Sequence, residues 1–217
     1  SANSGAGVWI GPFIEEEAVV FDVIPTSGPA TDNIVAGNYI GSNNSGVAAF
    51  GNGQNGISVI GATTLNNVIG GETAGAGNLI SGNLGAGIGL LEASEQTFIA
   101  GNRIGTNVLG NWALGNALSG VLIENSANNH IADNLISSNG SDGITIADPP
   151  SSITSINNLI TANRIGTNYN GMKVLPNAAS GVFIQNASYN TVGGLAEEDG
   201  NLISGNGGNG ILIQRSP

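Results

Sequence analysis

Two short phrases alternate along this chain from one end to the other. The first has the form Gly-[Val/Ile]-x-[Ile/Val/Leu] and begins at positions 7, 56, 87, 120, 143, 181 and 210. The second, Asn-x-Ile, recurs in every gap between them, at Asn38, Asn78, Asn102, Asn134, Asn163 and Asn201. Such regular internal repetition predicts a solenoid, in which each repeat forms one structural unit stacked on its neighbours.

The spacing between the two phrases takes only two values. Ile80, Ile136 and Ile203 each precede the apolar residue of the next Gly-initiated phrase by 8 residues, whereas the other three gaps are 17 residues long. Half of the units therefore carry an additional nine residues at one point, read as GTNVLGNWALGN and GTNYNGMKVLPN in the last two of them. Insertions of constant length at one point are typical of solenoids, which vary their loops and keep their core.

The apolar residues alternate over very short stretches, and Gly or Asn interrupts them every few residues. This is the periodicity of strands joined by tight corners, because no window has a sustained 3.6-residue pattern. Gly accepts positive φ at such corners and Asn tolerates it. We therefore predict an all-β, parallel β-helix of about six coils, formed by residues 1–217 as a single domain. Asn side chains at one corner are predicted to stack as an amide ladder. The predicted ladder consists of Asn38, Asn78, Asn102, Asn134, Asn163 and Asn201.

The pattern NxIxGNxIGT…LGN…SGVxI…NTxGG…GNLISGN resembles the right-handed parallel β-helix repeats of the pectate-lyase-like superfamily. It is similar in particular to the Asn- and Gly-rich arrays of large secreted bacterial surface proteins. The resemblance covers about residues 33–217 and implies a right-handed coil. It does not select an activity, because that superfamily includes lyases, hydrolases, epimerases and adhesins.

Composition excludes several classes of partner. The 217 residues contain 4 Lys+Arg and 15 Asp+Glu, a formal charge of −11, so nucleic acid and anionic membrane surfaces would be repelled. No apolar run is long enough to span a bilayer. The chain has no cysteine, which excludes disulfides and thiolate metal sites. The opening SANSGAG shows no signal peptide, and we expect any targeting segment to have been removed from a protein that is extracellular or at the cell surface.

Residues 11–32 break the repeat and are predicted to be an insertion or a capping element. A β-helix exposes unpaired backbone at both ends, and natural proteins usually cover such edges. The final GILIQRSP offers no cap of this kind. We therefore expect the chain to be part of a longer protein, or to meet other subunits through the open helix ends.

Four side chains form a candidate surface site. Arg103 and Arg164 hold the same repeat position two coils apart, so both should face outward on one sheet roughly 10 Å apart. His130 and Asp133 belong to the intervening coil. The favoured interpretation is that these side chains occupy exposed positions for solubility and edge protection; the alternative is a sugar-binding or lyase-like groove.

Other catalytic signatures are missing from the sequence. The clustered aspartates of the hydrolases and the Tyr-Gly-x-Asp-Pro-His-Asp motif of the epimerases do not occur, and no pair of carboxyl groups is placed for glycosidase chemistry. No catalytic residue is assigned, and we lean against an enzyme. No cofactor is expected; Ca²⁺ at the acidic run Glu197-Glu198-Asp199 is an alternative to a solvated charge run.

The outward position of the Gly-initiated phrase suggests a second surface. Trp9, Leu122, Phe183 and Leu212 would form an apolar stripe on one sheet. The favoured interpretation is that the long insertions fold over this stripe; if it is open, it suits sugar rings or a partner protein.

Taken as a whole, the sequence predicts a structural or adhesive extracellular β-helix segment of a larger surface protein or assembly, binding carbohydrate or a partner protein. The alternative is a lyase-like or epimerase-like domain that acts on uronate-rich polysaccharide. An enzyme of this kind should have a cleft with Arg103 or Arg164 beside carboxylates and should release unsaturated products from polyuronates. A structural segment should have smooth, loop-covered faces and end-to-end contacts.

Overall fold

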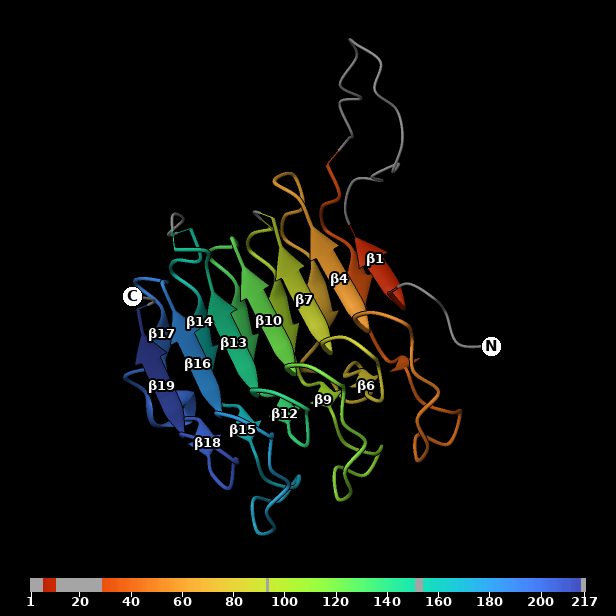
Figure 1. Ribbon diagram of the computed structural model, residues 1–217. Helices are drawn as coiled ribbons and strands as arrows, with labels where there is room; N and C mark the ends of the chain where they lie inside the picture. The colour runs from red at the N-terminus through yellow and green to blue at the C-terminus, as the bar shows by residue number, and fades with distance from the viewer. Residues whose placement is uncertain (1–5, 11–28, 93, 151–153, 216–217) are drawn as a thin grey trace.

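The chain forms a rod built from three parallel β-sheets (Figure 1). The structure is a computed structural model that describes residues 6–10, 29–92, 94–150 and 154–215. Most of the predicted insertion or cap at 11–32, namely residues 11–28, lies outside the described residues. Within them the only helical element is one turn of 3-10 helix, η1 (Glu197–Asp199).

Six coils each contribute one strand to three sheets, in the order A, B, C along the chain, and the last strand begins a seventh coil in sheet A. Sheet A contains β1 (Val8–Ile10), β4 (Ile57–Ile60), β7 (Ile88–Leu91), β10 (Val121–Glu124), β13 (Ile144–Ala147), β16 (Val182–Gln185) and β19 (Ile211–Gln214). Sheet B contains β2 (Ile34–Val35), β5 (Val68–Gly70), β8 (Phe98–Ala100), β11 (His130–Ala132), β14 (Leu159–Thr161) and β17 (Thr191–Val192). Sheet C contains β3 (Tyr39–Ile40), β6 (Leu79–Ile80), β9 (Arg103–Ile104), β12 (Leu135–Ile136), β15 (Arg164–Ile165) and β18 (Leu202–Ile203).

The register of these sheets confirms the parallel β-helix and its coils. Each strand pairs in parallel with the strand one coil away, so that Val121 lies between Ile88 and Ile144 in sheet A. The Gly-initiated phrase forms the strands of sheet A, and the Ile of the predicted Asn-x-Ile positions lies in sheet C. The strands of sheet B had no phrase of their own in the sequence analysis.

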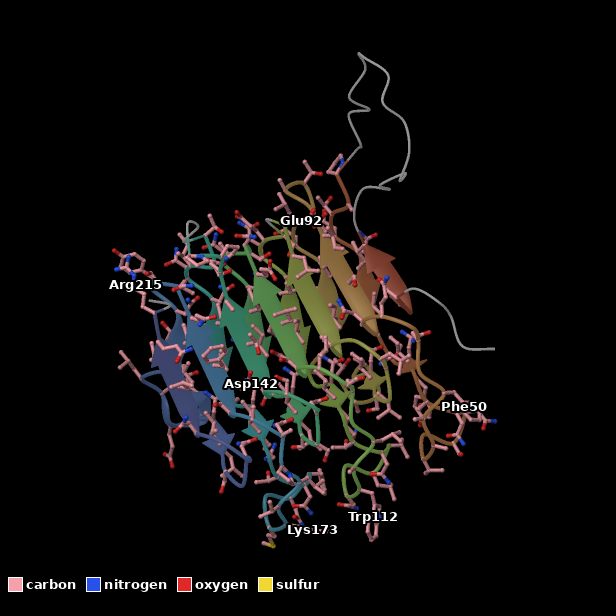
Figure 2. The ribbon with its side chains drawn as sticks, in the orientation of Figure 1. Phe50, Glu92, Trp112, Asp142, Lys173 and Arg215 are labelled. Atoms are coloured by element: carbon pink, nitrogen blue, oxygen red, sulfur yellow. The ribbon has the colours of Figure 1, made fainter. Side chains whose placement is uncertain are left out.

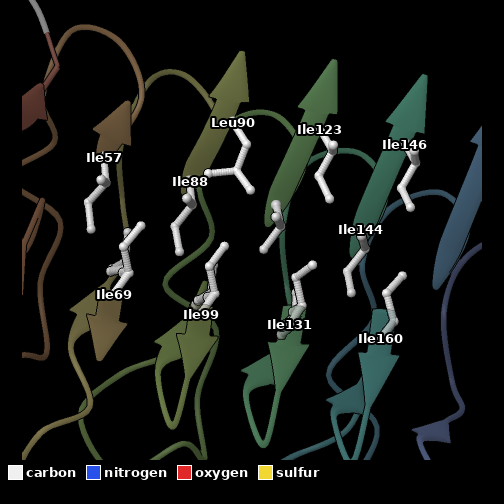
Figure 3. Packing of buried hydrophobic residues seen from close by; sticks show 14 of the residues in the cluster. Ile57, Ile69, Ile88, Leu90, Ile99, Ile123, Ile131, Ile144, Ile146 and Ile160 are labelled. Atoms are coloured by element: carbon white, nitrogen blue, oxygen red, sulfur yellow. The ribbon is translucent and has the colours of Figure 1, made fainter. Parts of the chain in front are cut away.

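The core consists of aliphatic side chains stacked in columns, one residue per coil. Ile69, Ile99, Ile131 and Ile160 form such a column in sheet B and are completely buried. They face the inward side chains of sheet A across the rod (Figure 3). Burial of one such side chain stabilises the fold by about 2 kcal/mol, so the repeated columns supply most of the driving force for folding.

The predicted asparagine ladder is present at the corner between sheets B and C. Each Nδ2 donates to Oδ1 of the asparagine in the next coil at 2.9–3.0 Å. That same Oδ1 also accepts the backbone N–H of the donating asparagine, as Asn134 Oδ1 does from Asn102. Its members are Asn38, Asn78, Asn102, Asn134, Asn163 and Asn201.

Two further ladders, which the sequence analysis missed, occupy the other corners. The corner between sheets C and A has six asparagines joined by amide hydrogen bonds of 2.8–3.0 Å, namely Asn52, Asn83, Asn116, Asn139, Asn177 and Asn206. The corner between sheets A and B has Asn33, Asn67, Asn129, Asn158 and Asn190, with Thr97 in the third place. At all three corners, side-chain amides therefore form hydrogen bonds with backbone groups that lie outside the strands.

Completing the third ladder is expected to stabilise the protein. Thr97 Oγ1 is buried without a hydrogen-bond partner, while the Thr97 N–H donates to Asn129 Oδ1 at 2.9 Å. In Thr97→Asn the new amide can donate to Asn129 Oδ1 and accept from Asn67, which should raise the free energy of unfolding by about 1 kcal/mol. Urea denaturation monitored by circular dichroism measures the change. Thr97→Val is the control, since it removes the unpaired hydroxyl without adding an amide; equal stability of the two variants would contradict the prediction.

Candidate functional site

Two arginines project from the outer face of sheet C. In this sheet Leu135 pairs with Arg103 on one side and with Arg164 on the other. The two arginines are thus two strand spacings apart, about 10 Å, as predicted from their repeat positions. Leu135 is almost buried between them, and Arg164 is exposed.

Three of the four candidate residues line one shallow depression. It has a volume of about 100 Å³, and its lining includes Arg103, Asp133, Leu135, Arg164 and Tyr169. Asp133 enters it from the corner between β11 and β12, where its backbone turns with a φ of 54°. Two arginines, one aspartate and one tyrosine thus line the depression together with Leu135. Such a set can bind a carboxylate or sulfate group bidentately through arginine.

A larger depression of about 490 Å³ adjoins the first and shares Arg103 and Asp133 with it. Its remaining lining comes mostly from the turn that follows β5, including Glu72 and Thr73. Acidic groups therefore stand on the sheet B side of Arg103. The positive side of the combined site is the side where Arg164 lies.

His130 lies around the corner from this depression. It points outward from β11 in sheet B, where its Nε2 is 2.8 Å from Thr161 Oγ1 and its ring centroid is 5.2 Å from that of Phe98. Burial lowers the pKa of His130, and the charges of Asp199, Glu72 and Asp133 act in the opposite direction. Asp133 is close enough for this electrostatic interaction, but His130 does not line the depression.

The three insertions fold into loops of the same design. Each is closed at its base by an antiparallel bridge, for example Thr106 with Ala113. An asparagine within each loop holds the turn, because Asn107 Oδ1 accepts the N–H groups of Asn111 and Trp112 at 3.0 and 3.2 Å. Asn43 and Asn168 do the same in the other two loops. The loops are therefore fixed structures.

The loops also stack on one another, although they arise from every second coil. Val108 N donates to Gly46 O, and Tyr169 N donates to Gly110 O, both at 2.9 Å. The intervening short coil supports the loop base, since Ser81 Oγ donates to Thr106 O. The three loops, residues 43–50, 107–114 and 168–175, thus form one continuous feature, here named the loop ridge. Figure 2 shows Phe50, Trp112 and Lys173 on it, on the side of the rod opposite Glu92.

The ridge exposes apolar side chains that the sequence analysis expected to be covering residues. Trp112 is 66% exposed and Phe50 69% exposed, while Lys173 Nζ lies 4.3 Å from the centroid of the Trp112 ring. The other exposed apolar residues of the ridge are Val47, Leu109, Tyr169, Met172 and Val174. The signal for this surface was present in the constant length of the insertions and their apolar content.

The expectation that the insertions fold over the apolar stripe is wrong. The glycines of the loops lie against outward side chains of sheet C: Gly46 against Leu79, Gly110 against Leu135 and Gly171 against Leu202. The positions of the stripe lie on sheet A, where Leu122, Phe183 and Leu212 share one register position and are half-buried. The stripe is not continuous, however: Ser58 and Gly89 separate Trp9 from Leu122, Thr145 separates Leu122 from Phe183, and Phe183 and Leu212 alone are neighbours.

The acidic run Glu197-Glu198-Asp199, considered as a Ca²⁺ site in the sequence, forms the 3-10 turn η1. Asp199 Oδ2 accepts the N–H of Ala196 at 3.2 Å, which uses part of its acceptor capacity within the turn. In the described part of the chain there is no group of three or more His, Cys, Asp or Glu side chains placed to hold a metal ion. Nor do those residues include a helix with the length and apolarity needed to cross a membrane.

Comparison with models of protein families, with curated proteins and with solved structures finds no match to this chain. The fold is therefore established by the strand pairing and by the asparagine ladders. The superfamily suggested by the sequence pattern remains a proposal.

Proposed function

We propose that this chain is a structural and adhesive segment of an extracellular surface protein or assembly, and that it binds its ligand through the loop ridge and the adjoining depression on sheet C. The observation that carries the proposal is the loop ridge itself: three loops of one design, fixed by internal hydrogen bonds, expose Phe50, Trp112 and Tyr169. Exposed apolar side chains on a rigid scaffold are typical of a binding surface.

The remainder of the molecule suits a scaffold. Two continuous asparagine ladders, a third that is interrupted only at Thr97, and an aliphatic core that is buried in the central coils join each coil to the next. Stability in such a solenoid comes from contacts between neighbouring repeats, so loops can vary without changing the core. Binding at the ridge then costs little ordering of the protein.

A second candidate function rests on the depression. Arg103 and Arg164 flank Leu135 with Asp133 nearby, and this arrangement favours an acidic sugar, which a uronate-active domain would bind there. In that case Arg103→Gln and Arg164→Gln would each abolish turnover and leave the fold intact, because both side chains are outward-facing.

One experiment separates the two functions. The purified chain is immobilised and tested for binding to surfaces coated with neutral polysaccharides, polyuronates and extracellular proteins, and the same polysaccharides are assayed for release of unsaturated products. Binding without product supports the adhesive segment. Unsaturated products that disappear in Arg164→Gln would establish the enzymatic alternative, and absence of both binding and turnover would contradict the proposed function.

A further inference from the structure

The charge of the loop ridge differs from that of the whole chain. The three segments 41–52, 105–116 and 166–177 contain no Asp or Glu, although the chain has 15. Their one charged residue is Lys173, which sits over the Trp112 ring. The ridge is therefore almost neutral on a protein of net charge −11, and a ligand recognised there does not need to carry charge.

The ridge also combines aromatic rings with amides. Trp112 and Tyr169 are more than half exposed, and Lys173 holds the indole from one face by a cation–π contact. Asn111 and Asn170 stand within the same loops. Flat rings accept the apolar faces of sugar rings, and amides exchange hydrogen bonds with hydroxyl groups.

A regular spacing runs along the ridge. Equivalent positions of successive loops are two coils apart, about 10 Å, because strands of a sheet are about 4.8 Å apart. This interval is comparable to the disaccharide repeat of an extended β-linked glycan. A linear chain lying parallel to the rod axis can therefore place an equivalent sugar beside each of the three loops. The rings that meet these sugars differ in position from loop to loop, since Trp112 aligns with Lys173 and Tyr169 with Val108.

From these observations we infer that the loop ridge binds a neutral, extended, β-linked polysaccharide, with Trp112 and Tyr169 as the main contacts. This inference rests on the proposed function and names its ligand. Loops that are already fixed lose little conformational entropy on binding. Contacts to successive loops act as linked binding sites, so the affinity for the glycan rises as it becomes long enough to reach the next loop.

The test uses calorimetric titration of the whole chain with neutral β-1,4-linked glucose and mannose oligosaccharides of two to six units, and with a polyuronate of matched length. We expect affinity to rise with the length of the neutral oligosaccharides. Trp112→Ala and Tyr169→Ala should each weaken binding of the longest by at least about tenfold, the usual effect of losing a central aromatic contact. Tyr189→Ala is the matched control. Tyr189 is 83% exposed and lies in the turn between β16 and β17, outside the loop ridge.

Three results would overturn the inference: no binding of any neutral oligosaccharide, equal affinity of Trp112→Ala and the unaltered protein, or binding of the polyuronate alone with loss in Arg103→Gln. The last result, or retention on a protein-coated surface only, would leave the adhesive function standing with a different ligand. Failure of both the inference and the adhesive function would appear as absence of binding to every surface.

Discussion

Asn134→Ala is expected to lower the free energy of unfolding by about 4 kcal/mol, because several buried polar groups lose their partners at once. Asn134 Oδ1 accepts the backbone and side-chain N–H groups of Asn102, and its Nδ2 donates to Ile99 O and to Asn163 Oδ1. All of these atoms lie in the interior, where water does not replace the missing amide. Equilibrium urea denaturation followed by circular dichroism measures the loss.

The control for this prediction comes from the same ladder. Asn38 stands at its exposed end, where its Nδ2 donates to Ala36 O and Asn78 Oδ1, so Asn38→Ala should cost about 1 kcal/mol or less. Asn134→Asp offers a second variant of unchanged shape, in which a carboxylate oxygen replaces the donor and faces Asn163 Oδ1. Asn134→Asp should be destabilised as strongly as Asn134→Ala at neutral pH. Similar losses of unfolding free energy in Asn38→Ala and Asn134→Ala would show that burial of the ladder is unimportant.

Gly105→Ala is expected to destabilise the protein by about 4 kcal/mol, the sum of about 1 for backbone strain and about 3 for overpacking. Gly105 has a φ of 86°, in the region that favours glycine. A Cβ at this position would overlap the carbonyl oxygen of Ser137 in the next coil and approach Asn139 Oδ1. Both neighbours are held in place, since Asn139 is a ladder residue and Ser137 is buried.

Gly75→Ala separates the two contributions. Gly75 has a φ of 87°, but no atom lies within 4 Å of the Cβ that alanine would add. This variant should therefore show the strain alone, about 1 kcal/mol. Thermal and urea denaturation of both variants measure the difference. If Gly75→Ala were as unstable as Gly105→Ala, the close approach of successive coils would not be the cause.

The strands of sheets A and C could be predicted because their residues repeat in phase. The phrase that begins at Gly120 and the phrase at Asn134 each specify an inward aliphatic residue beside a corner, and the structure places them as expected. Three further copies of the Asn-x-Ile phrase, at Asn67, Asn129 and Asn158, fall outside the alternation of the two phrases and belong to the corner between sheets A and B. The spacing alone does not tell the two corners apart, since both precede short strands.

The candidate site was predicted in part for a related reason. Register alone brings Arg103 and Arg164 to either side of Leu135, and the corner at Asp133 directs its carboxylate to the same depression. His130 is only three residues from Asp133, but the chain turns from sheet B to sheet C between them. Residues close in sequence therefore face different sides of the rod.

The direction of the loops could not be deduced from their length. Nine additional residues fix how far an insertion reaches but not which face it meets. That choice depends on contacts such as Gly110 with Leu135, and on the hydrogen bond from Tyr169 to Gly110 in the neighbouring loop. The alternation of long and short coils can be read from the sequence. The stacking of the loops on one another, two coils apart, depends on packing that the sequence pattern does not specify.

Within each of the three ladders every amide points the same way. The Nδ2 group of one coil donates to the Oδ1 of the following coil, from Asn38 to Asn78 and from Asn52 to Asn83, and Thr97 alone interrupts this order in the third ladder. Dipoles aligned head to tail add, as they do along an α-helix. The rod is therefore an electrically polar object along its axis. A coil entering with reversed chain direction would set carbonyl oxygen against carbonyl oxygen within the ladders, so the parallel winding is favoured by electrostatics as well as by the fit of the core.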